Sequence, residues 1–310
     1  MSWETVKLSE CCVSIADGDH LPPPKAESGI PFVTISNINA MNQIDFTNTM
    51  FVPQEYYDRL DSKRKAQVGD VLYSVVGSFG IPVYIKENQK FVFQRHIAIL
   101  RSNGKILPRF LYYTMLSRDF YAKADAAAIG AAQRTLSLTA LRNIEIDIPT
   151  IEEQNKIVDI LSAYDDLIEN NKKQIKLMEE AAQRLYKEWF VDLRFPGHEN
   201  TPIVDGVPKG WRKISLCDIA PIITGKKDAN FGTKDGAYPF FTCSQEPIKS
   251  PSYSFDTSAI ILAGNGDFNV KLYRGKFEAY QRTYVLSPIE EKYLYLLYNA
   301  VNENMAVLVK

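Results

Sequence analysis

The feature that most constrains this 310-residue chain is an internal repeat. Residues Trp3–Glu10 and Trp211–Asp218 share the pattern W-x-x-[VI]-x-L-x-[ED] and begin 208 positions apart. Residues Pro31–Ser36 match Pro239–Ser244 at the same spacing. Two separate matches at one spacing are hard to obtain by chance, and two copies are fewer than the roughly three that a stacked repeat array needs. The sequence therefore predicts a duplicated globular domain.

The repeat continues beyond these segments with a shifted spacing. The aligned pairs are Gly77 with Gly264, Gln94–Arg95 with Gln281–Arg282, and Leu111–Tyr112 with Leu294–Tyr295. The first two pairs are 187 positions apart, so the second copy is 21 residues shorter by that point. Residues 130–149 have no counterpart before Lys310, and we therefore expect the second copy to be incomplete.

A long helix is predicted between the two copies. Thr150 can cap its start, and Glu153 can reach back from three residues later to complete a capping box. No Pro or Gly follows until Pro196–Gly197, two residues that stop helices. About 40 residues can therefore be helical, which is roughly 60 Å of helix. We divide the chain into a first domain at 1–150, a helix at 151–195, and a second domain at 196–310.

Apolar residues recur along this helix at alternating spacings of four and three, which is typical of a coiled-coil seam. The polar member of the seam, Asn171, is expected to set the register against a partner helix. That partner is a second copy of the helix, another protomer or another subunit. The alternative, a core helix packed on its own domain, fits the unbroken spacing less well. The seam consists of Ile157, Leu161, Tyr164, Ile168, Asn171, Ile175, Met178, Ala182, Leu185 and Trp189.

Each copy combines predicted strands with predicted helices. Strands are expected at 30–38, 69–77, 91–101 and 276–287, where apolar runs are bounded by Gly and Pro or alternate with polar residues. Helices are expected at 108–124 and 291–304, where apolar residues lie three and four apart. Strands followed by helices indicate an α+β fold. The predicted architecture is two homologous α+β domains joined by a long coiled-coil helix.

Several loops combine basic, amide and aromatic residues near glycines. Arg, Lys, Asn and Gln carry the donors that match guanine and adenine edges, and glycine-rich turns let the backbone approach phosphates. We therefore name candidate DNA-binding residues, although a solvated turn remains the simpler interpretation of any single one. In the first copy they are Lys25, Ser78, Arg95, His96, Gln133 and Arg134. In the second copy they are Lys226, Lys227, Asn230, Lys234, Asn265, Lys271, Arg274 and Arg282.

Composition and motifs argue against several other classes of protein. The net charge is −1, so the chain as a whole is not basic. Phosphate-binding and dinucleotide-binding glycine motifs, a nucleophile elbow and an Asn-Pro-Pro-aromatic tetrapeptide are all absent from the sequence. The four cysteines form no Cys-x-x-Cys pair, which disfavours structural zinc and a disulfide framework. No secretion signal or apolar run of about 18 residues occurs, so we expect a cytoplasmic protein without a membrane span, catalytic site, metal or cofactor.

The end of the first copy carries the most specific motif. It reads Gly130-x-x-Gln133-Arg134-x-Leu136, then Ile146-Asp147-Ile148-Pro149, then Glu152-Glu153-Gln154-x-x-Ile157. Together with Ile30–Phe32, Gly69–Leu72 and the two W-x-x-[VI]-x-L openings, this arrangement resembles the specificity subunit of type I restriction–modification enzymes. The resemblance extends over the whole chain.

This resemblance implies target recognition without catalysis. Each globular copy would be a target recognition domain for one half of a split double-stranded DNA sequence. The long helices would pair antiparallel, set the spacing of the half-sites, and dock methyltransferase subunits that use S-adenosylmethionine. A restriction subunit would add ATP- and Mg-dependent activity. Because the second helix is absent from this sequence, we expect self-association through 151–195.

Two alternatives stay open at this point. The chain could be the recognition module of another DNA methyltransferase or nuclease system, such as a type IIG-like enzyme. It could also be a structural coiled-coil adaptor, although that role would not explain the duplicated domains.

Overall fold

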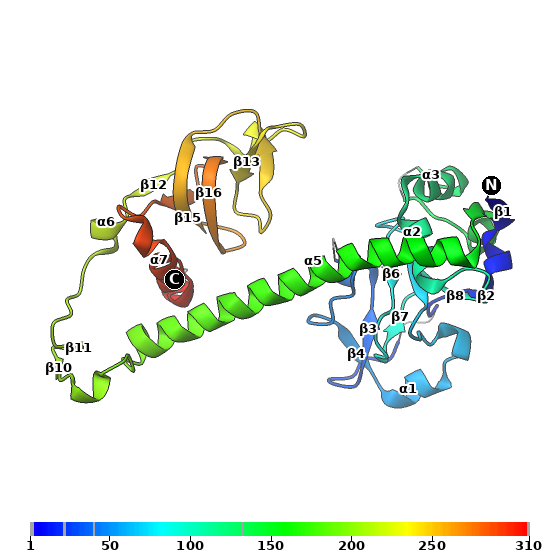
Figure 1. Ribbon diagram of the computed structural model, residues 1–310, viewed down its shortest axis with the longest axis horizontal. Helices are drawn as coiled ribbons and strands as arrows, with labels where there is room; N and C mark the ends of the chain where they lie inside the picture. The colour runs from blue at the N-terminus through cyan, green and yellow to red at the C-terminus, as the bar shows by residue number, and fades with distance from the viewer. Residues whose placement is uncertain (1–2, 21–22, 40, 132, 309–310) are drawn as a thin grey trace. The chain divides into compact units, whose positions relative to one another are not determined.

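The computed structural model describes residues 3–20, 23–39, 41–131 and 133–308 (Figure 1). These residues form two compact units, Met1–Ile168 and Glu169–Lys310. The division falls inside the longest helix, α5 (Ile151–Tyr186), so this helix contributes to both units.

The described residues of unit 1 form three small β-sheets. The four-stranded sheet has the order β2 (Cys12–Asp17), β8 (Ile97–Ser102), β5 (Val71–Ser74) and β6 (Pro82–Tyr84). The three-stranded sheet has the order β4 (Met50–Val52), β3 (Ile30–Val33) and β7 (Val92–Phe93). The third sheet pairs β1 (Glu4–Lys7) with β9 (Glu145–Ile148). The short helices are α1 (Gln54–Arg59), α2 (Pro108–Leu116), α3 (Arg118–Ala127) and α4 (Leu138–Asn143).

The core of unit 1 follows from the strand sequences. All four residues of β5 are buried, because apolar clusters cover both faces of this central strand. Tyr73 packs edge-to-face on Phe120 of α3, with ring centroids 5.5 Å apart. Trp3, the first residue of the repeat motif, packs edge-to-face on Phe110 of α2. The repeat motif therefore joins the N-terminus to the helical layer of unit 1.

The start of α5 forms as the sequence predicts. Thr150 Oγ1 accepts a hydrogen bond from the Glu153 amide at 3.3 Å, and Glu153 Oε2 accepts one from the Thr150 amide at 3.2 Å. This reciprocal arrangement satisfies backbone donors that a helix start otherwise leaves free. One turn further, the fully buried Gln154 accepts from the Leu107 amide at 2.8 Å and donates to the Pro149 carbonyl at 3.0 Å. Gln154 therefore ties the helix start to unit 1.

The end of the helix differs from the prediction of helix to 195. The α-helix stops at Tyr186, and a π-helical turn follows at Lys187–Val191. Leu193 then has φ +57°, which ends the helical path before Pro196. Stacking of Phe190 on Tyr186 and its contact with Trp211 accompany the wider turn. Trp189, predicted in the seam, thus lies in the π turn and outside the four–three spacing of the α-helix.

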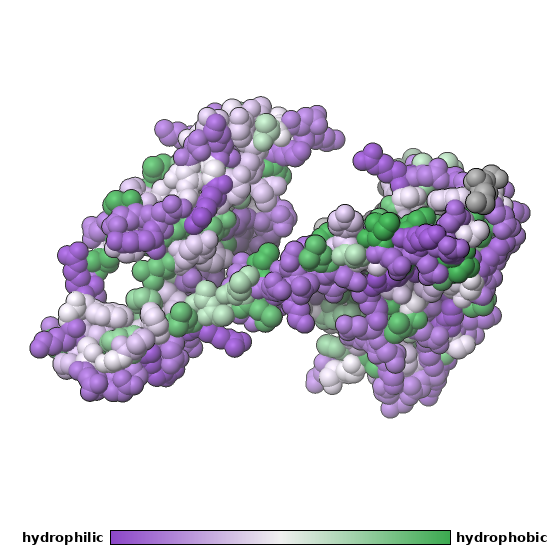
Figure 2. Space-filling model, viewed as in Figure 1, coloured by the Kyte–Doolittle hydropathy of each residue, from purple (hydrophilic) through white to green (hydrophobic). Residues whose placement is uncertain are grey.

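The rest of the seam lies along α5 and is largely open to solvent. Most of its apolar side chains are exposed, and Ile157 is half-buried against unit 1. In the space-filling view, hydrophobic residues appear along this helix between hydrophilic ones (Figure 2). The exposed members are Leu161, Tyr164, Ile168, Ile175, Met178 and Leu185.

Unit 2 contains one six-stranded sheet. Its order is β12 (Ile222–Thr224), β17 (Thr283–Leu286), β15 (Phe255–Ala263), β16 (Val270–Ala279), β13 (Tyr238–Phe241) and β14 (Ile248–Ser250). A short hairpin, β10 (Ile203–Val204) with β11 (Val207–Pro208), precedes it. The helices are α6 (Leu216–Ile219), α7 (Leu294–Glu303) and α8 (Met305–Leu308). Leu294, Leu297 and Val301 of α7 pack on the sheet.

The two units repeat the same strand pairings, as the duplication predicts. The parallel pair Phe32 with Val92 in unit 1 corresponds to Phe240 with Glu278 in unit 2. The antiparallel pairs β2–β8 and β5–β8 correspond to β12–β17 and β15–β17. The parallel pair keeps the 208-position spacing, with β3 matching β13, whereas β2 matches β12 at a spacing of 207. The predicted mixed fold of helices and sheets, repeated on either side of a long helix, is therefore confirmed.

Two of the sequence-based alignments were wrong by one or two positions. The hydrogen bond from the Ile97 amide to the Gln94 carbonyl corresponds to the one from Thr283 to Tyr280, so His96 corresponds to Arg282. Gly77, with φ +83°, corresponds to Gly266, with φ +68°. The pairing of β5 with β8 matches that of β15 with β17, and this match aligns each residue of β5 with the residue 189 positions later in β15. The predicted strand at 91–101 is interrupted by the turn at Gln94–Ile97, and the predicted strand at 276–287 is interrupted by the turn at Tyr280–Thr283. The loops that connect the strands differ in length between the two copies, so sequence comparison alone did not reveal these one- and two-residue shifts.

Candidate nucleic-acid interface

The element shared by both units is a tight turn held against a glycine. In unit 1, the Asp19 amide donates to the Phe93 carbonyl at 2.8 Å, and the Arg95 amide donates to the Asp19 carbonyl at 2.9 Å. A Cβ atom on Gly18 would lie 2.1 Å from the Phe93 carbonyl oxygen, so only glycine fits there. The turn therefore presents Arg95 at the surface, where its side chain is exposed.

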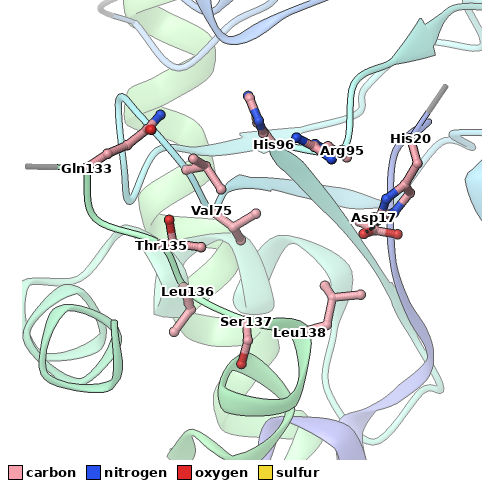
Figure 3. A pocket seen from close by; sticks show the side chains of 11 residues that line it. Asp17, His20, Val75, Arg95, His96, Gln133, Thr135, Leu136, Ser137 and Leu138 are labelled. Atoms are coloured by element: carbon pink, nitrogen blue, oxygen red, sulfur yellow. Dashed lines mark hydrogen bonds and ion pairs between the residues drawn. The ribbon is translucent and has the colours of Figure 1, made fainter. Parts of the chain in front are cut away.

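A pocket of about 410 Å³ opens beside this turn (Figure 3). Three candidates from the sequence line it, namely Arg95, His96 and Gln133. Figure 3 shows Arg95 and His96 on the turn, Gln133 on the opposite loop, and Asp17 close to His20. Apolar side chains and two hydroxyl groups complete the wall. These residues are Val75, Val76, Thr135, Leu136, Ser137 and Leu138.

The charges around the pocket are partly paired. His20 Nε2 lies 2.7 Å from Asp17 Oδ2, and Arg64 lies 3.6 Å from the other oxygen of the same carboxylate. Tyr56 donates to the carboxylate of Asp19, and burial together with this bond raises the pKa of Tyr56 to about 12. Among the residues that the structure describes, no carboxylate lies within ion-pair distance of Arg95. Its guanidinium is therefore available to a ligand.

The remaining candidates of unit 1 lie outside the pocket lining. Arg134 forms an ion pair with Asp125 at 2.7 Å, at the end of α3, and so secures the loop that carries Gln133. Ser78, at the tip between β5 and β6, and Lys25, before β3, are both exposed. The segment Thr135–Leu138 was not among the candidates. Its hydroxyl and apolar residues carry no sign of a binding role in the sequence. The bridge of Thr135 to Val76 and the hydrogen bond from the Leu136 amide to the Val75 carbonyl bring the segment to the pocket.

Unit 2 builds the same turn from different residues. A Cβ atom on Gly225 would lie 2.2 Å from the Ala279 carbonyl oxygen, and the Gln281 amide donates to the Lys227 carbonyl at 2.9 Å. Arg282 is exposed on this turn. The Lys227 ammonium lies over the Phe231 ring, 4.4 Å from its centroid. Exposed side chains on the adjoining loop are Lys226, Asn230 and Lys234.

Three candidates of unit 2 already have partners within the unit. Arg274 lies 3.5 Å from Glu291 and above the Tyr295 ring, on β16. Lys271 donates to the Ser244 carbonyl at 2.7 Å, and burial lowers the pKa of Lys271. Asn265 accepts a hydrogen bond from the Cys243 thiol at 2.8 Å. The structure thus brings Asn265, Lys271 and the Arg282 turn together and leaves Arg274 elsewhere on the sheet.

These groups have the chemistry of groove recognition. Arg and Asn side chains donate to guanine and adenine in the major groove, and apolar side chains can contact the thymine methyl group. A family model described as the type I restriction modification DNA specificity domain matches residues 1–180. The chain belongs to this family. The matched region holds the pocket, all of unit 1 and most of α5.

Curated relatives in this family are also named specificity subunits. The chain is 50% identical over 93 residues to the type I restriction enzyme EcoDI specificity subunit of Escherichia coli, a match over 29% of this chain and 21% of that protein. It is 35% identical over 124 residues to the MjaIX specificity subunit of Methanocaldococcus jannaschii, over 39% and 29% of the two chains. The matches to these two relatives thus span less than a third of each relative's length.

A solved structure shares the fold of this specificity-domain chain. The type I restriction–modification S subunit from M. genitalium aligns with a TM-score of 0.57 and 16% identity, over 99% of this chain and 78% of that one. Among the described residues, no group of three or more His, Cys, Asp or Glu side chains could hold a metal ion. No helix within the described ranges is both long and apolar enough to cross a membrane.

Proposed function

We propose that this chain is the DNA sequence-recognition subunit of a type I restriction–modification complex. In this proposal each unit recognises one half of a bipartite double-stranded target. The observation that carries the proposal is the family match over unit 1, combined with the same glycine-held turn in unit 2. Both turns carry an exposed Arg, the side chain that most often makes specific contacts with base edges.

The proposal assigns no catalysis to this chain. S-adenosylmethionine would be bound by the methyltransferase subunits, and ATP and Mg by the restriction subunit. The sequence contains neither a methyltransferase tetrapeptide nor a phosphate-binding loop, which supports assigning catalysis to the partner subunits. We infer that the complex acts in the cytoplasm, because its DNA target would be located there.

The spacer helix α5 would dock the partner subunits. Its exposed apolar seam has the spacing of a coiled coil, and seam residues such as Ile175 and Met178 are more than half exposed. An exposed apolar stripe of this length is unfavourable in water and marks an interaction surface. Methyltransferase helices or the same helix of a second copy would cover it.

Methylome sequencing tests the proposed function. Cells carrying the gene together with its methyltransferase partner are compared with cells in which only this gene is deleted. We expect one bipartite adenine-methylated motif to disappear with the gene. Conversely, methylation of DNA by the purified chain alone, measured with labelled S-adenosylmethionine, would contradict a non-catalytic role and favour a type IIG-like enzyme.

A further inference from the structure

A dense polar network joins two loops of unit 2 next to the Arg282 turn. The loop after β13 and the hairpin between β15 and β16 are linked by four side-chain hydrogen bonds. Cys243 donates to Asn265 at 2.8 Å, Asn269 donates to the Cys243 carbonyl at 3.0 Å, Lys271 donates to the Ser244 carbonyl at 2.7 Å, and Gln245 donates to Asp267 at 2.8 Å. Such a network restrains the two loops relative to each other.

Unit 1 has apolar residues at the corresponding positions. A Cβ atom on Gly77 would lie 3.6 Å from Ile35, and one on Gly266 would lie 3.9 Å from Cys243. Since Gly77 corresponds to Gly266, Ile35 corresponds to Cys243. Val76 lines the pocket of unit 1, and the same strand register places Asn265 at its position in unit 2. An apolar pair has therefore been replaced by a thiol and an amide.

The thiol of Cys243 contacts both the side chain of Asn265 and the backbone of Arg282. It donates to Asn265 Oδ1, and it lies 3.6 Å from the carbonyl oxygen of Arg282. The Gly264 amide donates to that same carbonyl at 2.9 Å. Asn265 and Arg282 are therefore held side by side, with the Cys243 thiol in contact with both.

The orientation of the Asn265 amide determines what it can recognise. Its Oδ1 atom uses one lone pair for the thiol and keeps a second, and among the described residues its Nδ2 group has no hydrogen-bond partner, so both donors remain. An acceptor beside a donor is the pattern that pairs with N6 and N7 of adenine in the major groove. The apolar Val76 of unit 1 cannot make that pair.

We propose that Asn265 recognises an adenine in the half-site of unit 2, that Arg282 contacts the neighbouring part of that half-site, and that Cys243 is the residue that positions both. This inference rests on the proposed function and adds to it a base identity and a positioning residue. A side chain fixed before binding loses less conformational freedom when DNA binds, and so discriminates better.

Methylome sequencing of variants tests the base assignment. In Asn265→Ala, one adenine of one half-site should become degenerate, with discrimination reduced roughly 10- to 100-fold, while the other half-site stays unchanged. Cys243→Ala should relax the same position less, and Cys243→Ser should restore it because a hydroxyl also donates to Asn265. Asn200→Ala, an exposed asparagine of unit 2 outside these loops, is the matched control. Thermal unfolding of each variant monitors the fold, since a merely structural defect would lower methylation at all positions together.

Alkylation of Cys243 gives a second readout. A Cys217→Ser background removes the exposed thiol of α6. Burial raises the pKa of Cys11, and that of Cys12 to about 12, so these two thiols stay protonated and react slowly. We expect a duplex with the methylome-derived motif to slow N-ethylmaleimide labelling of Cys243 several-fold. A duplex in which that adenine is replaced should protect it less.

The outcomes separate the inference from the proposed function. A motif that depends on the gene but keeps its adenine in Asn265→Ala overturns the inference alone. Equal labelling of Cys243 with both duplexes does the same. If no motif depends on the gene when its methyltransferase partner is present, both the proposed function and the inference are overturned.

Discussion

Unit 1 and unit 2 have the same framework but differ in the residues that it presents. Both hold a turn against a glycine, Gly18 or Gly225, at a distance that no side chain tolerates. Around this turn, unit 1 places a pocket with apolar walls and a His20–Asp17 pair, whereas unit 2 places a network of thiol, amide and ammonium groups. The comparison teaches that backbone contacts fix the position of the turn proposed for recognition, while the side chains around it differ between the units.

The largest effect is expected from the glycines that define the shared turn. Gly18→Ala and Gly225→Ala would each place a Cβ atom within 2.2 Å of a backbone oxygen, so backbone has to move. Each should lower the stability of its own unit by about 3 kcal/mol, measured by urea unfolding. Gly104→Ala is the control, because nothing lies within 4 Å of its Cβ position and only its φ of +92° is strained. Full tolerance of Gly225→Ala would show that the two turns are not built alike.

The features of the fold and the site that the sequence predicts are those that depend on residues close together in the chain. The Thr150–Glu153 cap and strands such as β3, β5 and β17 follow from residues near in sequence, and they were predicted. The turn at Gln94–Ile97 was not, because its flanks alternate like one continuous strand. Arg134 resembled a DNA contact, yet its partner Asp125 comes from α3, which pattern analysis does not place beside it. Likewise, the pocket wall at Thr135–Leu138 is brought in only by tertiary contacts.

The second prediction concerns α5, whose apolar seam is exposed, unlike the buried apolar residues of the globular parts of both units. If the exposed seam binds the same helix of a second copy, sedimentation of the wild-type chain should show a dimer at micromolar concentration. Ile168→Asp together with Ile175→Asp would bury two charges in that interface and should weaken association roughly 100-fold. Asn171→Leu keeps the seam apolar and should strengthen association while losing register. A wild-type chain that stays monomeric at micromolar concentration would count against self-association.

The third prediction concerns the attachment of α5 to unit 1. Gln154→Leu would leave the Leu107 amide and two carbonyl groups without their buried partner, because Gln154 also donates to the Lys105 carbonyl at 3.2 Å. The expected loss of stability in unit 1 is about 2 kcal/mol. Gln174→Leu, on the exposed surface of the same helix, should change stability by no more than about 0.5 kcal/mol. Equal unfolding midpoints for the two variants would mean that this buried amide does not hold the helix.

The smallest effects should separate the two exposed turn arginines, Arg95 and Arg282, from Arg274 on β16. Arg95→Ala and Arg282→Ala should each weaken binding of the methylome-derived duplex about tenfold, and each should relax a different half-site. Arg274→Ala should change affinity less than about twofold, because Arg274 lies on β16 and is paired with Glu291 at 3.5 Å. Fluorescence anisotropy at one fixed salt concentration measures all three, since phosphate contacts vary with salt. An Arg274→Ala effect as large as that of Arg282→Ala would extend the interface of unit 2 along β16. Relaxation of the same half-site by Arg95→Ala and Arg282→Ala would end the assignment of one half-site to each unit.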